Sequence, residues 1–104
     1  MKAFLIDAYE QSIEPIEIEA SLDAIRQAIG FDSIESDDVD GNDDRLFFDE
    51  ECFIRKQPRP GRFQLDTLPP VAGRGVVVGG GPEADTLGDP EIVLEDLRGR
   101  VKFS

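Results

Sequence analysis

Hydrophobic and polar residues alternate in a strand-like manner in the first part of the chain. Residues 2–8 form a nearly continuous apolar run, and residues 13–19 alternate isoleucine with glutamate in their second half, so both segments are predicted to be β-strands. Residues 9–12 then make the turn of an antiparallel pair. Because Pro15 has no backbone N–H to donate, we expect it at a sheet edge or near the start of its strand.

Residues 21–30 have the spacing of a short amphipathic helix. Ser21 is a suitable N-cap, and Gly30 is a suitable C-terminal stop because glycine adopts the left-handed backbone conformation without strain. The apolar residues that share one face of this helix are Leu22, Ile25 and Ile29.

Strand signals return after the helix. Residues 31–36 are predicted to be a third strand, and the Asp40-Gly41 pair is predicted to be the hairpin turn before a returning strand at residues 45–49. A tight reversal is expected before residues 52–55.

Prolines and glycines shape the second half of the chain. Residues 58–70 predict a long irregular connection around a short strand-like segment at residues 63–68, and residues 71–79 form the strongest late strand. Asp89 and Pro90 are typical of a helix N-cap and first helical turn, so a C-terminal helix is expected there. Its apolar residues are Ile92, Val93 and Leu97.

These elements predict one α+β domain over residues 1–104, with a mostly antiparallel sheet of five or six strands, the helix from Ser21 packed on one face, and a C-terminal helix. A chain of 104 residues can bury a core without disulfides. Cys52 is the only cysteine, so no intramolecular disulfide can form. We expect a cytoplasmic protein without membrane contact, because no apolar stretch approaches the roughly 20 residues of a membrane span and the first residues do not form a secretory signal.

The charge of the chain is strongly negative, with 23 acids against 11 bases, no histidine and a formal net charge of -12. Residues 1–50 hold 15 acids and 3 bases, whereas residues 51–104 hold 8 of each, so the whole imbalance lies in the first half. Direct binding to a nucleic-acid backbone is not expected, because such binding depends on lysine and arginine. Solubility alone would also explain an acidic composition.

The stretch from Glu35 to Arg45 places six acids around Gly41 and invites comparison with a calcium loop. With Gly41 at position 6 of an EF-hand loop, Ser36 falls at position 1 and Phe47 at position 12, where the loop needs a bidentate glutamate. We therefore expect no metal site and no cofactor.

Candidate catalytic groups are few. Cys52 has acidic and apolar neighbours and the chain has no histidine to activate it, so Cys52 is predicted to be a core residue. Gly73, Gly75 and Gly79 lack the spacing of a phosphate-binding loop and lead into a strand, so we expect them to serve turns and close packing. We expect that the protein is not an enzyme.

A local excess of four positive charges lies within residues 55–74. We expect these bases to pair with the acidic half of the same chain, with another copy of the chain as the alternative. The residues are Arg55, Lys56, Arg59, Arg62 and Arg74, against Asp66 alone.

Several segments resemble a known family. The opening strand pair, the helix at residues 21–30, the LFFDEE turn at residues 46–51 and the VAGRGVVVG run at residues 71–79 look like a family of small phage and bacterial proteins known as domain of unknown function 3846. The resemblance spans most of residues 1–98. The family offers no activity or catalytic residue to transfer, so the resemblance implies only a context: a cytoplasmic protein of bacteria, their phages or mobile elements.

The acidic half provides the main functional hypothesis. We expect a non-enzymatic interaction or inhibitor module that presents an acidic face, resembling a nucleic acid, to a basic host protein. The alternative is an accessory domain that binds a divalent cation or a small ligand, or that assembles with itself, for example as a homodimer. The residues expected on the acidic face are Glu14, Glu17, Glu19, Asp37, Asp38, Asp40, Asp43 and Asp44.

Overall fold

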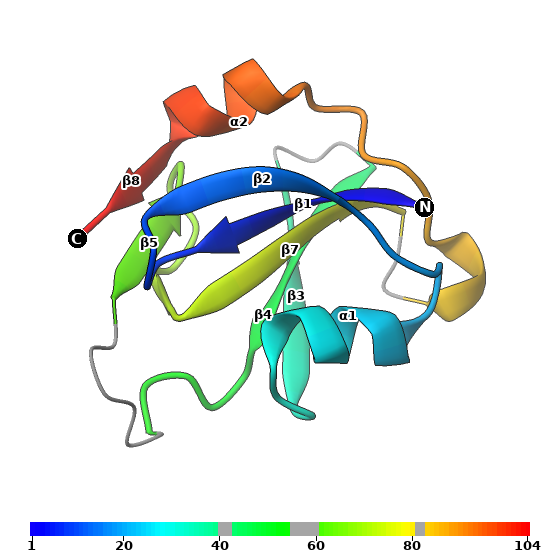
Figure 1. Cartoon of the computed structure of the whole chain (residues 1–104), viewed down its shortest axis with the longest axis horizontal. Coiled ribbons are helices and arrows are strands. Elements are labelled where there is room, and N and C mark those ends of the chain that lie inside the picture. Colours follow the sequence, from blue (N-terminus) through cyan, green and yellow to red (C-terminus); the bar gives the residue numbers. More distant parts are fainter. Residues whose placement is uncertain (40–42, 55–60, 81–82) are drawn as a thin grey trace.

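The computed structural model describes residues 1–39, 43–54, 61–80 and 83–104, which form two antiparallel sheets and two α-helices (Figure 1). The five-stranded sheet has the order β2-β1-β7-β4-β3, and the three-stranded sheet has the order β6-β5-β8. The predicted α+β fold with a C-terminal helix is confirmed; the predicted turn at Asp40 and Gly41 lies outside the described residues. In chain order the elements are β1 (Lys2–Asp7), β2 (Ser12–Glu17), α1 (Leu22–Ile29), β3 (Ile34–Asp38), β4 (Asp44–Asp49), β5 (Arg62–Leu65), β6 (Val71–Ala72), β7 (Arg74–Gly79), the 3-10 helix η1 (Ala84–Thr86), α2 (Leu94–Arg100) and β8 (Val101–Phe103).

Local signals in the sequence set both ends of α1. The Ser21 hydroxyl accepts a hydrogen bond from the Ala24 N–H at 3.1 Å, and Gly30 ends the helix with a φ of 94°. Both predictions are confirmed. Ile25 and Ile29 are buried against one face of the five-stranded sheet. The strand residues in this layer are Ala3, Phe47, Val76 and Val78.

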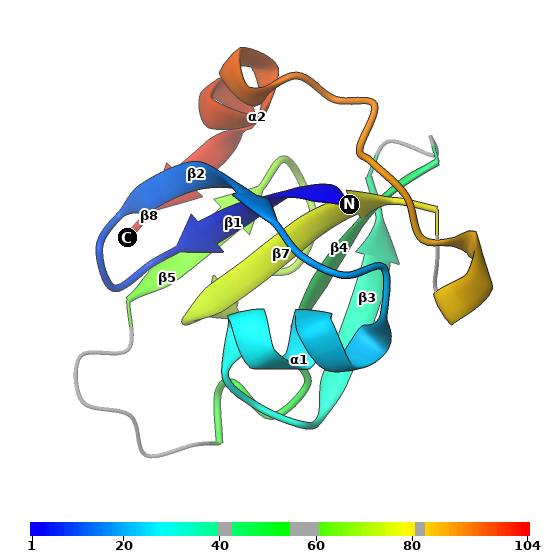
Figure 2. The same cartoon turned by 45° about the vertical axis from the view of Figure 1, so that its right-hand side comes forward.

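A second layer covers the opposite face of the five-stranded sheet, as Figure 2 shows for α2 and β8 on the side away from α1. Because the central strands bury side chains on both faces, they appear in the sequence as nearly continuous apolar runs. Cys52 is 5% exposed and belongs to this layer, so its predicted place in the core is confirmed. Other members are Ile6, Leu46, Phe63, Leu65, Val77 and Leu97.

The apolar run at residues 71–79 forms two strands instead of the one predicted. β6 and β7 belong to different sheets, and Gly73 between them has a φ of 90°, a conformation that lets the chain turn from one sheet to the other. Gly75 allows the two sheets to approach, since a Cβ there would lie 2.6 Å from the Phe63 ring. The predicted role of these glycines in turns and close packing is confirmed.

The three-stranded sheet depends on a C-terminal strand that the sequence pattern does not indicate. β5 pairs with β6 on one side and with β8 on the other. Ser104 and Arg62 also exchange backbone hydrogen bonds of 2.9 and 3.2 Å. β8 has three residues and directly follows α2, so it is too short to show an alternating pattern.

Residues 88–92, which we call the strap, are not helical. The C-terminal helix begins later than predicted: α2 starts at Leu94, with Val93 as its N-cap. Asp89 does not cap that helix, because its Oδ1 instead accepts the backbone N–H of Lys2 at 2.8 Å. The predicted helix start is therefore wrong, and the chain crosses the end of β1 before the helix begins.

Asp44 holds the strap from the other side. It is 2% exposed, and its two carboxylate oxygens accept the backbone N–H groups of Glu91 and Ile92, each at 2.7 Å. A third link joins Gly79 to Gly88 by backbone hydrogen bonds of 2.8 and 2.9 Å. The prediction that Asp44 lies on an exposed acidic face is therefore wrong: its charge is buried because two backbone donors satisfy it.

Gly75→Ala is expected to lower the free energy of unfolding by about 1–3 kcal/mol, because the added methyl would overlap Phe63 and Leu46. Gly99→Ala is the matched control. Nothing lies within 4 Å of a Cβ at Gly99, and alanine favours a helix interior, so stability should stay the same or rise by up to about 1 kcal/mol. Urea unfolding measures both values, and equal stability of the two variants would contradict the close contact.

Asp44→Asn is expected to lower the free energy of unfolding by about 1.5–3 kcal/mol, because an amide offers one oxygen where the carboxylate serves two donors. Asp43→Asn removes the same charge from the exposed neighbour and should change stability by less than about 0.5 kcal/mol. Urea unfolding measures both, and the Glu91 and Ile92 amides should exchange faster only in the Asp44 variant. Similar losses of stability in the two variants would show that the negative charge matters and that the hydrogen bonds between Asp44 and the strap do not.

Candidate functional site

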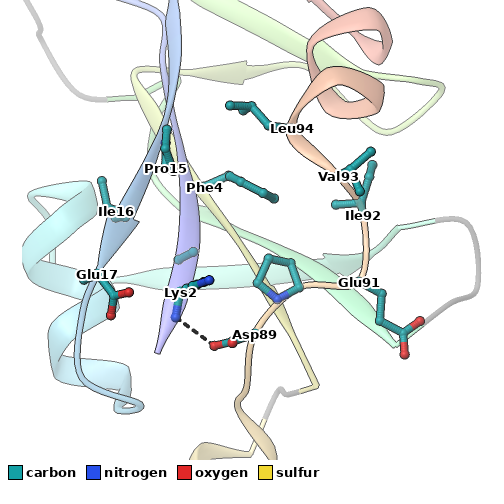
Figure 3. Close-up of a pocket in the computed structure, with 12 residues that line it drawn as sticks. Lys2, Phe4, Pro15, Ile16, Glu17, Asp89, Glu91, Ile92, Val93 and Leu94 are labelled. Atoms are coloured by element: carbon teal, nitrogen blue, oxygen red, sulfur yellow. Dashed lines mark hydrogen bonds between the residues drawn. The ribbon is translucent and has the colours of Figure 1, made fainter.

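A groove of about 610 Å³ runs between the β1–β2 pair and the segment that includes the strap. Figure 3 shows Phe4 pointing from β1 toward this segment, with Pro15 of β2 beside it and Ile92, Val93 and Leu94 on the opposite wall. Phe4, Ile92 and Leu94 pack against the core, whereas Val93 is 58% exposed. The groove is therefore an apolar surface that continues the core and opens to solvent.

Charged side chains lie at one end of the groove, below its apolar part in Figure 3. Glu17 lies on the β2 side and Glu91 on the strap side (Figure 3). Asp89 lies between them and accepts the Lys2 backbone N–H. Of the residues drawn in Figure 3, these three are acidic and Lys2 alone is basic, so the rim favours a positively charged ligand.

The outer edge of β2 offers little backbone to a partner. β2 is an edge strand, so Pro15 lies at a sheet edge as predicted. Edge strands can bind a partner strand through backbone hydrogen bonds, but Pro15 has no N–H, and the Ile13 carbonyl already accepts a hydrogen bond from Arg98 Nη2 at 2.9 Å. A ligand in the groove would therefore meet side chains instead of an open strand edge.

The predicted acidic residues lie at one end of the five-stranded sheet but on its opposite edges. Glu17 of β2 lies opposite Lys2 of β1, and Asp38 of β3 lies opposite Arg45 of β4. Both pairs are level with the C-terminal end of β7. Four strand spacings, roughly 19 Å, separate β2 from β3. The acids of the first half thus form two groups at this end of the sheet, and apart from Asp44, which is buried, the shared acidic face stays a prediction.

Ion pairs reduce the free charge of both groups. Asp38 pairs with Arg45 at 2.5 Å, and Glu17 lies 3.9 Å from the N-terminal ammonium. Glu14 and Glu17 point to opposite sides of the sheet because they are three positions apart along β2. Asp40 lies outside the described residues. Of the others, Glu14, Glu17, Glu19, Asp38 and Asp43 are exposed and Asp37 is half-buried.

Acids from the second half of the chain lie between these two groups, and no sequence pattern indicated them. The strap contributes Asp89 and Glu91, and the segment of η1 contributes Glu83 and Asp85 at the right-hand side of Figure 1. Their part of the chain has balanced charge, so composition gave no signal. We call the combined surface the acidic end; its described members are Glu17, Glu19, Asp38, Asp43, Glu83, Asp85, Asp89 and Glu91.

The other end of the five-stranded sheet carries two arginines stacked on aromatic rings. The guanidinium carbon of Arg74 lies 5.3 Å from the ring centre of Tyr9, and that of Arg62 lies 5.1 Å from the ring centre of Phe53. Arg74 also pairs with Asp7 at 3.2 Å, which confirms for this arginine the predicted pairing with the acidic half. We call Tyr9, Phe53, Arg62 and Arg74 the arginine end.

The environment of Tyr9 keeps its hydroxyl neutral. Burial raises the pKa of the Tyr9 phenol, Arg74 acts in the opposite direction, and the carboxylates of Asp7 and Asp49 add to the rise. The Tyr9 phenol therefore carries no negative charge at physiological pH.

The described residues offer little support for metal chemistry. Among residues 1–39, 43–54, 61–80 and 83–104, no three His, Cys, Asp or Glu side chains come together to hold a metal ion, so the cation-binding alternative finds no site in this part of the chain. Neither helix in these ranges has the length and apolar character needed to cross a bilayer. Arg55, Lys56 and Arg59, which were also predicted to pair with acids, lie outside these ranges.

No family model, curated protein or solved structure matches the chain. The resemblance to the family known as domain of unknown function 3846 stays a prediction.

Proposed function

We propose that this protein is a non-enzymatic protein-binding module whose groove takes a basic segment of a partner protein through an apolar anchor residue. The observation that carries this proposal is the exposed apolar wall at Val93, in a groove that has Glu17, Asp89 and Glu91 at one end. An exposed apolar surface with a polar rim is typical of protein-interaction sites. The acidic rim and the net charge of -12 favour a basic partner.

Apolar burial would supply most of the affinity. An isoleucine, leucine or phenylalanine of the partner would contribute about 1.5–3 kcal/mol on entering the groove, and it would also cover Phe4 and Val93. The acids of the rim are exposed, so each ion pair would contribute at most about 1 kcal/mol and would mainly speed the encounter. Salt should therefore weaken binding without abolishing it.

Backbone hydrogen bonds hold the groove in place before a partner arrives. The strap is fixed by the Asp44 carboxylate, by the bond between Asp89 and Lys2, and by the paired backbones of Gly79 and Gly88. A wall that is already ordered loses little conformational entropy on binding. This preorganisation supports a binding role for the groove.

The acidic end supports attraction of a basic partner but gives weaker support to mimicry of a nucleic acid. Such a mimic needs carboxylates in a row on one surface, whereas the two groups from the first half lie on opposite edges and Asp44 is buried. The proposal keeps the basic partner of the sequence-based hypothesis and adds an apolar anchor. In the bacterial or phage context that the resemblance implies, the partner would be a host protein.

A phage-display library of short random peptides selected on this protein should become enriched in sequences that place lysine or arginine beside a large apolar residue. Val93→Asp should weaken the best peptide at least about tenfold, equivalent to about 1.4 kcal/mol, because it places a hydrated charge in the apolar wall. Thr67→Asp adds the same charge at an exposed position outside the groove and should bind like the parent. Fluorescence anisotropy measures the affinities, which should fall as salt rises from about 0.05 to 0.3 M.

The proposal would be overturned by enrichment of acidic or uncharged peptides. Equal binding by the Val93→Asp and Thr67→Asp variants would also overturn it, because the groove would then not be the site.

A further inference from the structure

Three of the exposed large hydrophobic side chains among the described residues belong to two surfaces at opposite ends of the molecule. Val93 lies in the groove, whereas Phe53 and Ile54, which are 55% and 78% exposed, follow β4 at the other end. We call Phe53 and Ile54 the apolar knob. Adjacent large apolar side chains that remain in solvent indicate a surface that a partner covers.

The turn that carries the apolar knob is anchored to the fold. Asp49 is 1% exposed and accepts the Glu51 N–H through Oδ1 at 3.1 Å and the Cys52 N–H through its carbonyl at 3.2 Å. Cys52 is buried, and its Sγ accepts the backbone N–H of Ala72 at 3.5 Å. The apolar knob therefore projects from a fixed turn, which makes it a preorganised ligand.

Basic residues accompany the apolar knob. The Arg62 guanidinium stacks on the Phe53 ring and is exposed. In the sequence, Arg55 and Lys56 directly follow Ile54, and across residues 50–62 four bases stand against two acids. A large apolar side chain beside positive charge is the chemistry that the acid-rimmed groove would bind.

The apolar knob and the groove of one molecule cannot meet. The length of β4 lies between them. Asp44, at the start of β4, holds the strap, and Asp49, at the end of β4, holds the turn that carries the knob. Five residue steps along a strand span roughly 17 Å, so the strap and the turn of the knob are held at opposite ends of β4. A contact between them requires two molecules.

We infer that a second copy of this chain occupies the groove, an inference that rests on the proposed function. The apolar knob of one molecule docks against Phe4 and Val93 of the next, and Arg62 beside the knob approaches Glu17 and Glu91. The contact joins two different surfaces, so each molecule in a pair keeps one free knob or one free groove. Assembly therefore proceeds head to tail, toward a ring or an open chain, and does not stop at a two-fold dimer.

The net charge of -12 opposes association, because whole molecules repel one another at long range. At about 0.15 M salt this repulsion is screened beyond roughly 8 Å. The positive charge of Arg62 and the carboxylates of the rim would approach more closely than that, so their attraction would be screened less. Measurements of assembly are therefore best made at this salt concentration.

Analytical ultracentrifugation of the full chain tests the inference with two variants and their mixture. The unchanged protein should form species larger than a dimer as its concentration rises. Ile54→Asp disables the knob and Val93→Asp disables the groove, so each variant alone should remain monomeric. Mixed in equal amounts, they should form a one-to-one complex and nothing larger, because one working knob and one working groove remain.

Thr67→Asp is the control, since it adds the same charge at an exposed site outside both surfaces and should assemble like the unchanged protein. All three positions are exposed, so the variants should fold, and circular dichroism and thermal melts verify this. A monomeric unchanged protein would overturn the inference. So would a mixture that stays monomeric, or an association that only one of the two variants abolishes.

The outcomes separate this inference from the proposed function. Peptide binding by a chain that stays monomeric would reject self-assembly and leave the groove as a site for another protein. Failure of both peptide binding and assembly would reject the groove itself.

Discussion

Two buried carboxylates, one at each end of β4, hold the exposed surfaces of this protein in position. Asp44 accepts backbone N–H groups from the strap, and Asp49 accepts one from the turn of the apolar knob. A buried carboxylate without donors is costly, so each aspartate keeps its backbone partners close. The wall of the groove and the projection of the apolar knob both depend on these contacts, although neither aspartate reaches the surface that would meet a partner.

The elements that the sequence predicted well depend on neighbours within a few residues. α1 is such a case, because the Ser21 cap and the Gly30 stop act over one helical turn. Asp44 is the opposite case. It stands in a run of acids and looked exposed, but its donors, Glu91 and Ile92, lie 47 and 48 positions further along the chain. No local pattern indicates such a contact. The same reason explains why Asp89 was mistaken for a helix cap, since its partner is the backbone of Lys2.

The candidate site was only partly visible in the sequence. The edge position of Pro15 followed from its missing N–H, and the buried place of Cys52 followed from its apolar neighbours. The groove could not be predicted from the sequence, because Phe4 belongs to an apolar strand and Val93 belongs to a segment with helical signals. The net charge of each half of the chain also gave no sign of the acidic end, because this surface combines residues of β2 and β3 with residues of the strap, which lies in the half with balanced charge.

The closed edge of β2 determines how these molecules could accumulate. Exposed strand edges allow sheets of different molecules to join into one continuous sheet, the route by which many proteins form fibrils. On β2 this route is obstructed by the ring of Pro15 and by the arginine bound to the Ile13 carbonyl. Contacts made through side chains at the groove exchange more readily than a shared sheet, so molecules joined through the groove would separate again on dilution.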